Sequence, residues 1–229
     1  MNEHIAVKEL SEKLLDDYKT ESSFFFASPT RTILTEGEFT TVKHREIESF
    51  PELVQATLSN AKQAGNPNPI VVGALPFDRR KEVQLIVPEY SRISERLQLD
   101  TTNQLETNEN VTFEMTPVPD PEVYMNGVKQ GIEKIQDGDL KKIVLSRSLD
   151  VKSSEKIDKQ KLLRELAEHN KHGYTFAVNL PKDEKENSKT LIGASPELLI
   201  SRNGMQVISN PLAGSRPRSE DPVEDKRRA

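Results

Sequence analysis

Four stretches of the chain carry apolar residues at the spacing of an amphipathic helix. We predict helices over residues 5–18, 49–64, 120–137 and 157–169. Two of these helices have clear start signals, because Ser49 and Asp120 each stand just before a proline of the first turn. Gly65 and Gly138 close the same two helices.

Short apolar or alternating runs predict strands between the helices. The runs are residues 24–28, 32–35, 39–42, 70–75, 83–87, 111–115, 174–180, 190–194, 198–201 and 205–209. Residues 92–110 are polar and show no period, so we predict a linker or a long surface excursion there. Many strands follow one another across short turns, such as the one at Asn203 and Gly204. This order indicates an α+β fold with largely antiparallel sheets rather than a doubly wound parallel sheet.

Composition and charge disfavour or exclude several classes of function and of binding site. The chain has 229 residues and a formal net charge of -5, which disfavours a nucleic-acid or anionic-membrane surface. It has no cysteine, which excludes disulfides and thiolate metal sites. The first residues contain no long apolar run, so we expect neither a signal peptide nor a membrane anchor. The expected location is the cytoplasm. With four histidines and no tryptophan, the chemistry is expected to rest on lysine, acidic residues, arginine and backbone groups.

Residues 219–228 near the end of the chain are mostly charged. Ser219 is a candidate helix cap, and Asp221 and Glu224 favour a first turn. No apolar face follows, however, and a helix without one has little reason to form. This pattern alone leaves open whether the end is a frayed tail or a truncation.

Three segments carry the candidate chemistry. They are residues 141–147 (K-K-I-V-L-S-R), 191–199 (L-I-G-A-S-P-E-L-L) and 210–216 (N-P-L-A-G-S-R). In this order they resemble the chorismate-utilising enzymes, which include isochorismate synthases, salicylate synthases and the large subunits of anthranilate and aminodeoxychorismate synthases. The resemblance covers residue 122 to the end. Residues 24–29 (F-F-F-A-S-P) are similar to the isochorismate synthases of siderophore pathways, which make the precursor of 2,3-dihydroxybenzoate.

The resemblance implies an anthranilate synthase component I-like fold, with mainly antiparallel sheets flanked by helices and incomplete at the C-terminus. Residues 1–110 would be its N-terminal part, and residues 111–229 the first part of the chorismate-binding catalytic region. The implied reaction is a Mg²⁺-dependent isomerisation of chorismate to isochorismate, in which water adds at C2 and the C4 hydroxyl leaves. Chorismate is then the expected small-molecule partner of a monomer that binds neither nucleic acid nor membrane.

Lys142 matches the position of the family's general base. A lysine near its reference pKa of about 10.4 is a poor base, so this role requires a pKa lowered by desolvation. From the segment alone, an exposed lysine at a strand edge is the commoner situation. Family members that add ammonia look as if they carry glutamine here, so Lys142 favours water as the nucleophile.

Glu197 matches the general acid for the C4 hydroxyl, and Gly214 with Ser215 matches a substrate-binding turn. A carboxyl group that acts as an acid needs a raised pKa, which the apolar neighbours of Glu197 in the sequence would favour. A glycine lets backbone approach a carboxylate, and the serine can donate to it. Without the resemblance, a solvent-facing glutamate and an ordinary turn would be the simpler interpretations.

The family's Mg²⁺ ligands are glutamates downstream of the Gly-Ser turn, so we expect none within this chain and place them beyond Ala229. The resemblance therefore favours truncation, and we expect the 229-residue chain alone to be inactive. A salicylate synthase, which would go on to eliminate pyruvate, is the nearest alternative, and an aminating synthase is less favoured because of Lys142. A truncated, non-catalytic chorismate-binding or partner protein is the alternative from another class.

Overall fold

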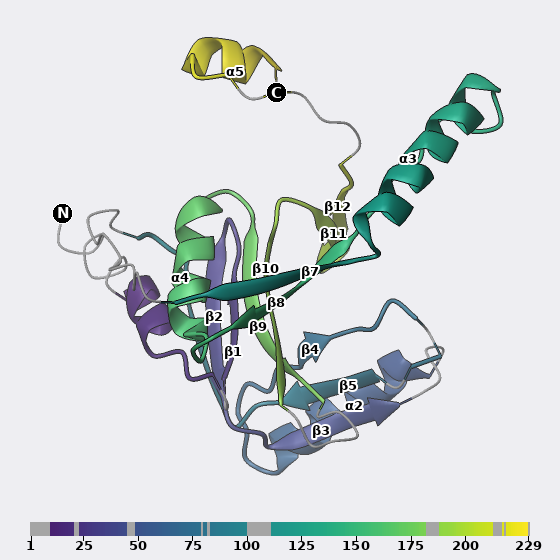
Figure 1. The fold of residues 1–229 in the computed structure, drawn as a ribbon. Helices are drawn as coiled ribbons and strands as arrows, with labels where there is room; N and C mark the ends of the chain where they lie inside the picture. The colour runs from purple at the N-terminus through teal and green to yellow at the C-terminus, as the bar shows by residue number, and fades with distance from the viewer. Residues whose placement is uncertain are drawn as a thin grey trace. The chain divides into compact units, whose positions relative to one another are not determined.

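The computed structural model describes residues 10–20, 23–44, 49–78, 80–81, 83–99, 111–181, 188–212, 217 and 219–228 (Figure 1). The chain divides into two compact units. Unit 1 comprises Met1–Thr102 and Lys159–Ala229, and unit 2 comprises Asn103–Asp158. All strand pairs of the described residues are antiparallel, and helices accompany the sheets. The predicted α+β class is confirmed.

Unit 1 contains a five-stranded sheet in the order β10-β9-β1-β2-β6. Its strands are β1 (Ser23–Ala27), β2 (Arg31–Glu36), β6 (Tyr90–Glu95), β9 (Tyr174–Leu180) and β10 (Lys189–Ser195). Strand β9 pairs with β1, so that Phe25 stands opposite Ala177 across about 150 residues of sequence. Because of this pairing, the compact units do not coincide with a division at residues 110 and 111.

Strand β6 corrects the prediction of a linker that begins at residue 92. Its residues are mostly exposed, and only Ser94 is buried. The strand lies at the sheet edge, where its ladder with β2 places Ile93 opposite Ile33, and Thr32 Oγ1 donates to the Glu95 carbonyl at 2.9 Å. A mostly exposed edge strand buries too few side chains to show an apolar alternation, because backbone pairing and polar side-chain bonds hold it in the sheet.

Helices cover one face of this sheet and make the main core. The helical residues 10–16 and helix α4 (Lys159–His169) lie against it (Figure 1). The fully buried side chains of this core include Leu14, Leu15, Phe25, Leu34 and Leu163. Each such side chain contributes roughly 1.5–3 kcal/mol by leaving water. One core therefore joins residues from both sequence segments of unit 1.

A smaller sheet in unit 1 has the order β3-β5-β4, with β3 at Thr40–His44, β4 at Val72–Ala74 and β5 at Val83–Val87. Helix α2 (Phe50–Gln63) packs against this sheet. Its Phe50, Leu53 and Val54 lie against the buried Val42, Val83 and Leu85 of β3 and β5. Gly73 has a φ of 149°, and a Cβ there would stand 2.6 Å from Leu85 Cδ2. Only glycine fits this position without a shift of Leu85.

The rest of unit 1 is a hairpin and a short helix. Strands β11 (Leu198–Asn203) and β12 (Gln206–Asn210) turn at Gly204, whose φ of 60° suits the predicted hairpin turn. Helix α5 (Pro222–Arg228) forms without a buried apolar face, since Val223 is 78% exposed. Capping bonds support it instead, because the Asp221 carboxylate accepts from Val223 N at 2.8 Å and Asp225 accepts from Ser219 N at 2.9 Å.

Unit 2 is a strand pair with one long helix. Strands β7 (Phe113–Val118) and β8 (Ser148–Ser153) pair, and helix α3 (Pro121–Gln136) lies between them in sequence. Asp120 caps α3 as predicted, with its side chain accepting from Glu122 N at 3.1 Å. Strand β8 is an addition to the prediction, and the apolar residues 143–145 belong to no described strand.

Candidate functional site

Glu197 lies in the turn that joins β10 to β11. Its backbone N–H donates to Ser195 Oγ at 3.2 Å, and its Oε1 accepts from the backbone N–H of Leu212 at 2.9 Å. Leu212 follows the end of β12, where Leu198 and Asn210 form the base of the hairpin. The Glu197 carboxylate, just before β11, therefore bonds across the base of the β11–β12 hairpin to Leu212, just after β12.

The surroundings of Glu197 differ from the prediction. Its side chain is exposed, as is that of Pro196, so the described residues do not desolvate the carboxyl group. Leu199, two residues along the sequence, is itself 85% exposed, and Leu212, whose N–H is bonded to the carboxylate, is 51% exposed, so neither covers it. Within the described residues, the predicted burial of Glu197 by its apolar neighbours in the sequence is therefore not found.

The predicted substrate-binding turn, Gly214 and Ser215, lies outside the described residues. Leu212, which precedes this turn in the sequence, is nevertheless held by the hydrogen bond from its backbone N–H to the Glu197 carboxylate. Two of the three predicted segments therefore meet at this hydrogen bond.

Lys142 belongs to unit 2 and precedes an apolar run that packs on helix α3. A Cβ on Gly131 would lie 3.2 Å from Ile143 Cγ2, and a Cβ on Gly127 would lie 4.0 Å from Leu145 Cδ1. Each glycine inside a helix costs about 1 kcal/mol relative to alanine. At Gly131 this cost is offset by the close approach of Ile143, so the helix surface fixes the path of the segment that carries Lys142.

The side chain of Lys142 is exposed, and so is that of Val144 at 77%. Ile143 and Leu145 face the helix glycines while Lys142 and Val144 face solvent, as alternation along an extended segment predicts. The predicted desolvation of Lys142 is therefore absent from the described residues. A base at this position requires a further surface that covers residues 141–147.

Metal ligands were searched among the described residues. No group of three or more histidine, cysteine, aspartate and glutamate side chains in that part of the chain could hold a metal ion. The described acids therefore do not fit a Mg²⁺ site, since Mg²⁺ requires oxygen ligands gathered around one point.

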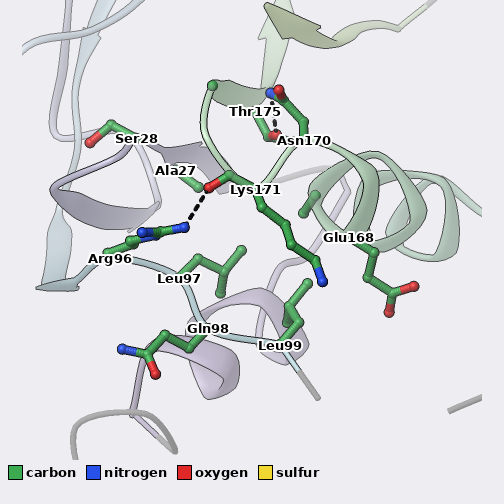
Figure 2. A pocket seen from close by; sticks show the side chains of 12 residues that line it. Ala27, Ser28, Arg96, Leu97, Gln98, Leu99, Glu168, Asn170, Lys171 and Thr175 are labelled. Atoms are coloured by element: carbon green, nitrogen blue, oxygen red, sulfur yellow. Dashed lines mark hydrogen bonds between the residues drawn. The ribbon is translucent and has the colours of Figure 1, made fainter. Parts of the chain in front are cut away.

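A cavity of about 330 Å³ lies elsewhere in unit 1, between the end of β1, the residues after β6 and the end of α4 (Figure 2). Arg96 Nη2 donates to the carbonyl of Lys171, another residue of its lining, at 2.8 Å. On another side Asn170 Nδ2 donates to Thr175 Oγ1 at 3.2 Å. The sequence patterns gave no sign of this cavity, because its lining comes from three distant segments. Glu197 and Lys142 are not among the residues that line it.

The family model described as chorismate binding enzyme matches residues 62–229. The chain belongs to this family. The match includes all three segments that the sequence analysis singled out, and its residues come from both compact units. Among the described residues, none of the helices has the length and apolar character that a membrane span needs.

Two curated relatives of this chain bear the name isochorismate synthase. The chain is 48% identical over 234 residues to isochorismate synthase DhbC of Bacillus subtilis. It is 36% identical over 224 residues to the vibriobactin-specific isochorismate synthase of Vibrio cholerae. These alignments cover 100% and 96% of this chain, but only 58% and 54% of the two relatives. The chain thus spans little more than half the length of the proteins it matches.

Solved structures agree with this placement. A crystal structure of a Bacillus anthracis protein, assigned provisionally as the 2,3-dihydroxybenzoate-specific isochorismate synthase DhbC, is 88% identical with a TM-score of 0.81. That comparison covers 96% of this chain and 56% of the other. The menaquinone-specific isochorismate synthase MenF of Escherichia coli is 16% identical with a TM-score of 0.66, over 95% of this chain and 54% of that one. At that identity the likeness shows the fold alone.

Proposed function

We propose that this chain is part of an isochorismate synthase that supplies isochorismate for a siderophore precursor. The proposal is supported by the identity to DhbC along the whole chain and by the three motif segments inside the family match. The observation that carries it is the bond between Glu197 and Leu212, which joins the predicted acid to the chain that enters the predicted substrate turn. In this proposal the protein acts as a cytoplasmic monomer that requires Mg²⁺.

The proposed reaction exchanges one water for another. Lys142 removes a proton from the water that attacks C2 of chorismate, and the ring double bonds shift. The C4 hydroxyl leaves as water after it takes a proton from Glu197. Atoms balance, because one water enters and one leaves, so the net change is an isomerisation. Gly214 and Ser215 would hold a carboxylate of the substrate, whereas no step is assigned to Mg²⁺, because the described residues do not fit its site.

The exposure of both groups sets a condition on this mechanism. Lys142 and Glu197 lie in solvent in the described chain, whereas acid and base catalysis by these side chains depends on desolvation. The relatives are longer by more than two fifths of their length. We therefore propose that the unmatched part of the fold covers both residues, and that the 229-residue chain alone does not turn over chorismate.

The test is a full-length form in which this chain is joined to the part of the Bacillus anthracis relative that it does not cover. With chorismate and Mg²⁺, chromatography of the products is expected to show isochorismate from this form and no product from the chain alone. Salicylate with pyruvate would identify a salicylate synthase instead. Turnover by the chain alone would contradict the proposed need for a covering part.

The roles of the two residues are tested in the same form. Lys142→Ala is expected to lower kcat by about 10²–10⁴-fold, the usual contribution of a general base or acid, and Glu197→Gln to act similarly. Lys141→Ala is the matched control, because it removes a neighbouring exposed lysine that has no assigned role. Near-normal turnover by Lys142→Ala would overturn the base assignment.

A non-catalytic chorismate-binding protein is a second candidate, favoured by the partial coverage of the relatives. Calorimetry with chorismate and the chain alone separates the two. Heat of binding by the chain, together with an inactive full-length form, would support this candidate over the enzyme.

A further inference from the structure

The turn that carries Glu197 is closed by a serine. Ser195 is the last residue of β10, where it stands opposite Tyr174 of β9. Its Oγ accepts the Glu197 N–H at 3.2 Å, two residues along the chain. Pro196 lies between them and has no N–H, so the Glu197 amide is the first after Ser195 that can close the turn. The serine hydroxyl thus fixes the backbone from which the Glu197 side chain leaves.

Beneath this turn the chain makes an unusually close contact. A Cβ on the buried Gly173 would stand 2.5 Å from the Ser195 carbonyl oxygen and 2.4 Å from Asn170 Oδ1. Neither contact is possible for a real Cβ, and the carbonyl cannot move without its strand. Gly173 therefore lets the loop after α4 lie directly against the backbone of Ser195.

The loop that carries Gly173 is itself held by the side chain of Asn170. Its Nδ2 donates to the Tyr174 carbonyl at 3.1 Å and to Thr175 Oγ1 at 3.2 Å, at the start of β9 (Figure 2). Because β9 pairs with β10 along its whole length, this loop and Ser195 form one continuous support. The opposite end of Glu197 is fixed as well, since Leu212 N–H donates to its carboxylate at 2.9 Å.

We propose that Ser195 is a positioning residue for the Glu197 carboxyl group, and that Gly173 provides the space that keeps Ser195 in place. The proposal rests on the proposed function, because it gives Glu197 the role of the acid. Ser195 acts through the Glu197 backbone and not on the substrate. A displacement of a reacting group by about 1 Å can cost on the order of 10²-fold in rate, so one lost hydroxyl can be visible in kcat.

The kinetic test uses the full-length form described above. Ser195→Ala is expected to lower kcat about tenfold with KM nearly unchanged, because substrate contacts remain. Ser195→Thr retains the hydroxyl and is expected to restore most of the rate. In a Glu197→Gln background, Ser195→Ala is expected to add less than about twofold, because the residue through which Ser195 acts is already disabled.

Ser209→Ala is the matched control. Its Oγ donates to the Leu199 carbonyl at 2.7 Å in the neighbouring hairpin, so the variant also loses one hydroxyl-to-backbone bond but leaves the Glu197 turn intact. An equal loss in Ser209→Ala and Ser195→Ala would overturn the proposal, and so would a full additional loss in the Glu197→Gln background. A Ser195→Thr enzyme as slow as Ser195→Ala would overturn it too.

A second measurement separates this proposal from the proposed function. In the 229-residue chain, amide hydrogen exchange measured by NMR is expected to show less protection at Glu197 and Leu212 after Ser195→Ala. Gly173→Ala is expected to reduce protection at the same two amides. Unchanged protection would refute the positioning role. Reduced protection in the chain, combined with near-normal activity of Glu197→Gln, would retain the structural link and refute the acid assignment.

Discussion

The hydroxyl of Tyr18 is a buried polar group whose removal should be measurable. Tyr18 is 3% exposed in the main core, where its ring meets Phe25 edge-on with centroids 6.4 Å apart. Its Oη has no hydrogen-bond partner among the described residues. A buried polar group without a partner costs about 1–3 kcal/mol. Tyr18→Phe keeps the ring and removes that cost, so it is expected to raise the free energy of unfolding at neutral pH by up to this amount.

The same residue gives a dependence on pH. Burial raises the pKa of Tyr18 to about 12 from an ordinary value of 10.0. Between these values the unfolded chain has lost a proton that the folded chain still binds, so stability decreases as the pH rises. The stability linked to the neutral Tyr18 hydroxyl is fully present below pH 10.0 and is lost as the pH rises towards about 12. Two units at 1.36 kcal/mol each give about 2.7 kcal/mol, an order-of-magnitude figure.

Urea unfolding followed by circular dichroism, at neutral pH and at several alkaline values, measures both effects. The wild-type chain is expected to lose up to about 2.7 kcal/mol more than Tyr18→Phe as the pH rises through this range, with similar m-values. Tyr90→Phe is the matched control, because it removes the same hydroxyl from a ring that is 71% exposed and keeps Tyr18. An identical alkaline loss in Tyr18→Phe and wild type would refute the argument from burial. A large destabilisation by Tyr18→Phe at neutral pH would show that the hydroxyl is satisfied.

Two further substitutions test the packing and the ion pairs of unit 1. Phe25→Ala is expected to lower the free energy of unfolding in urea by about 3–5 kcal/mol, because Phe25 is fully buried. Phe77→Ala is the control, and it should change that free energy by no more than about 0.5 kcal/mol because Phe77 is 104% exposed. Equal effects of the two substitutions would disprove the assigned core. The hydrogen bond from Arg92 holds the pKa of Asp17 below its usual value, so this pair stabilises the fold above about pH 3.9 and stops doing so as the pH falls further. Asp17→Asn should therefore cost under about 1 kcal/mol at neutral pH and nothing in strong acid, and a cost that persists in acid would contradict the pairing.

The candidate site residues could be named from the sequence because they lie in short segments that resemble a known family, and their roles stay predictions. Lys142, Glu197, Gly214 and Ser215 were all found as members of short segments in a fixed order. Ser195 lies inside one of those segments, but its hydroxyl acquires a role only through the geometry of the turn. Gly173 carries no motif, and its importance is visible only when the Ser195 carbonyl lies against it. The described residues leave Lys142 and Glu197 exposed, which their apolar neighbours in the sequence did not reveal, because desolvation depends on surfaces that distant residues supply.

The sequence by itself determined the local elements of this protein. Caps, prolines, glycine turns and apolar periods act within a few residues, and they predicted the long helices, the β11–β12 hairpin and the α+β class. Only the tertiary structure decided which strands are neighbours. The pairing of β9 with β1 and the edge position of β6 depend on backbone hydrogen bonds and on one shared core, and neither leaves a period in the sequence. The hydrogen bond between Glu197 and Leu212 also depends on the tertiary structure, because these residues are fifteen positions apart and meet only when the β11–β12 hairpin has formed.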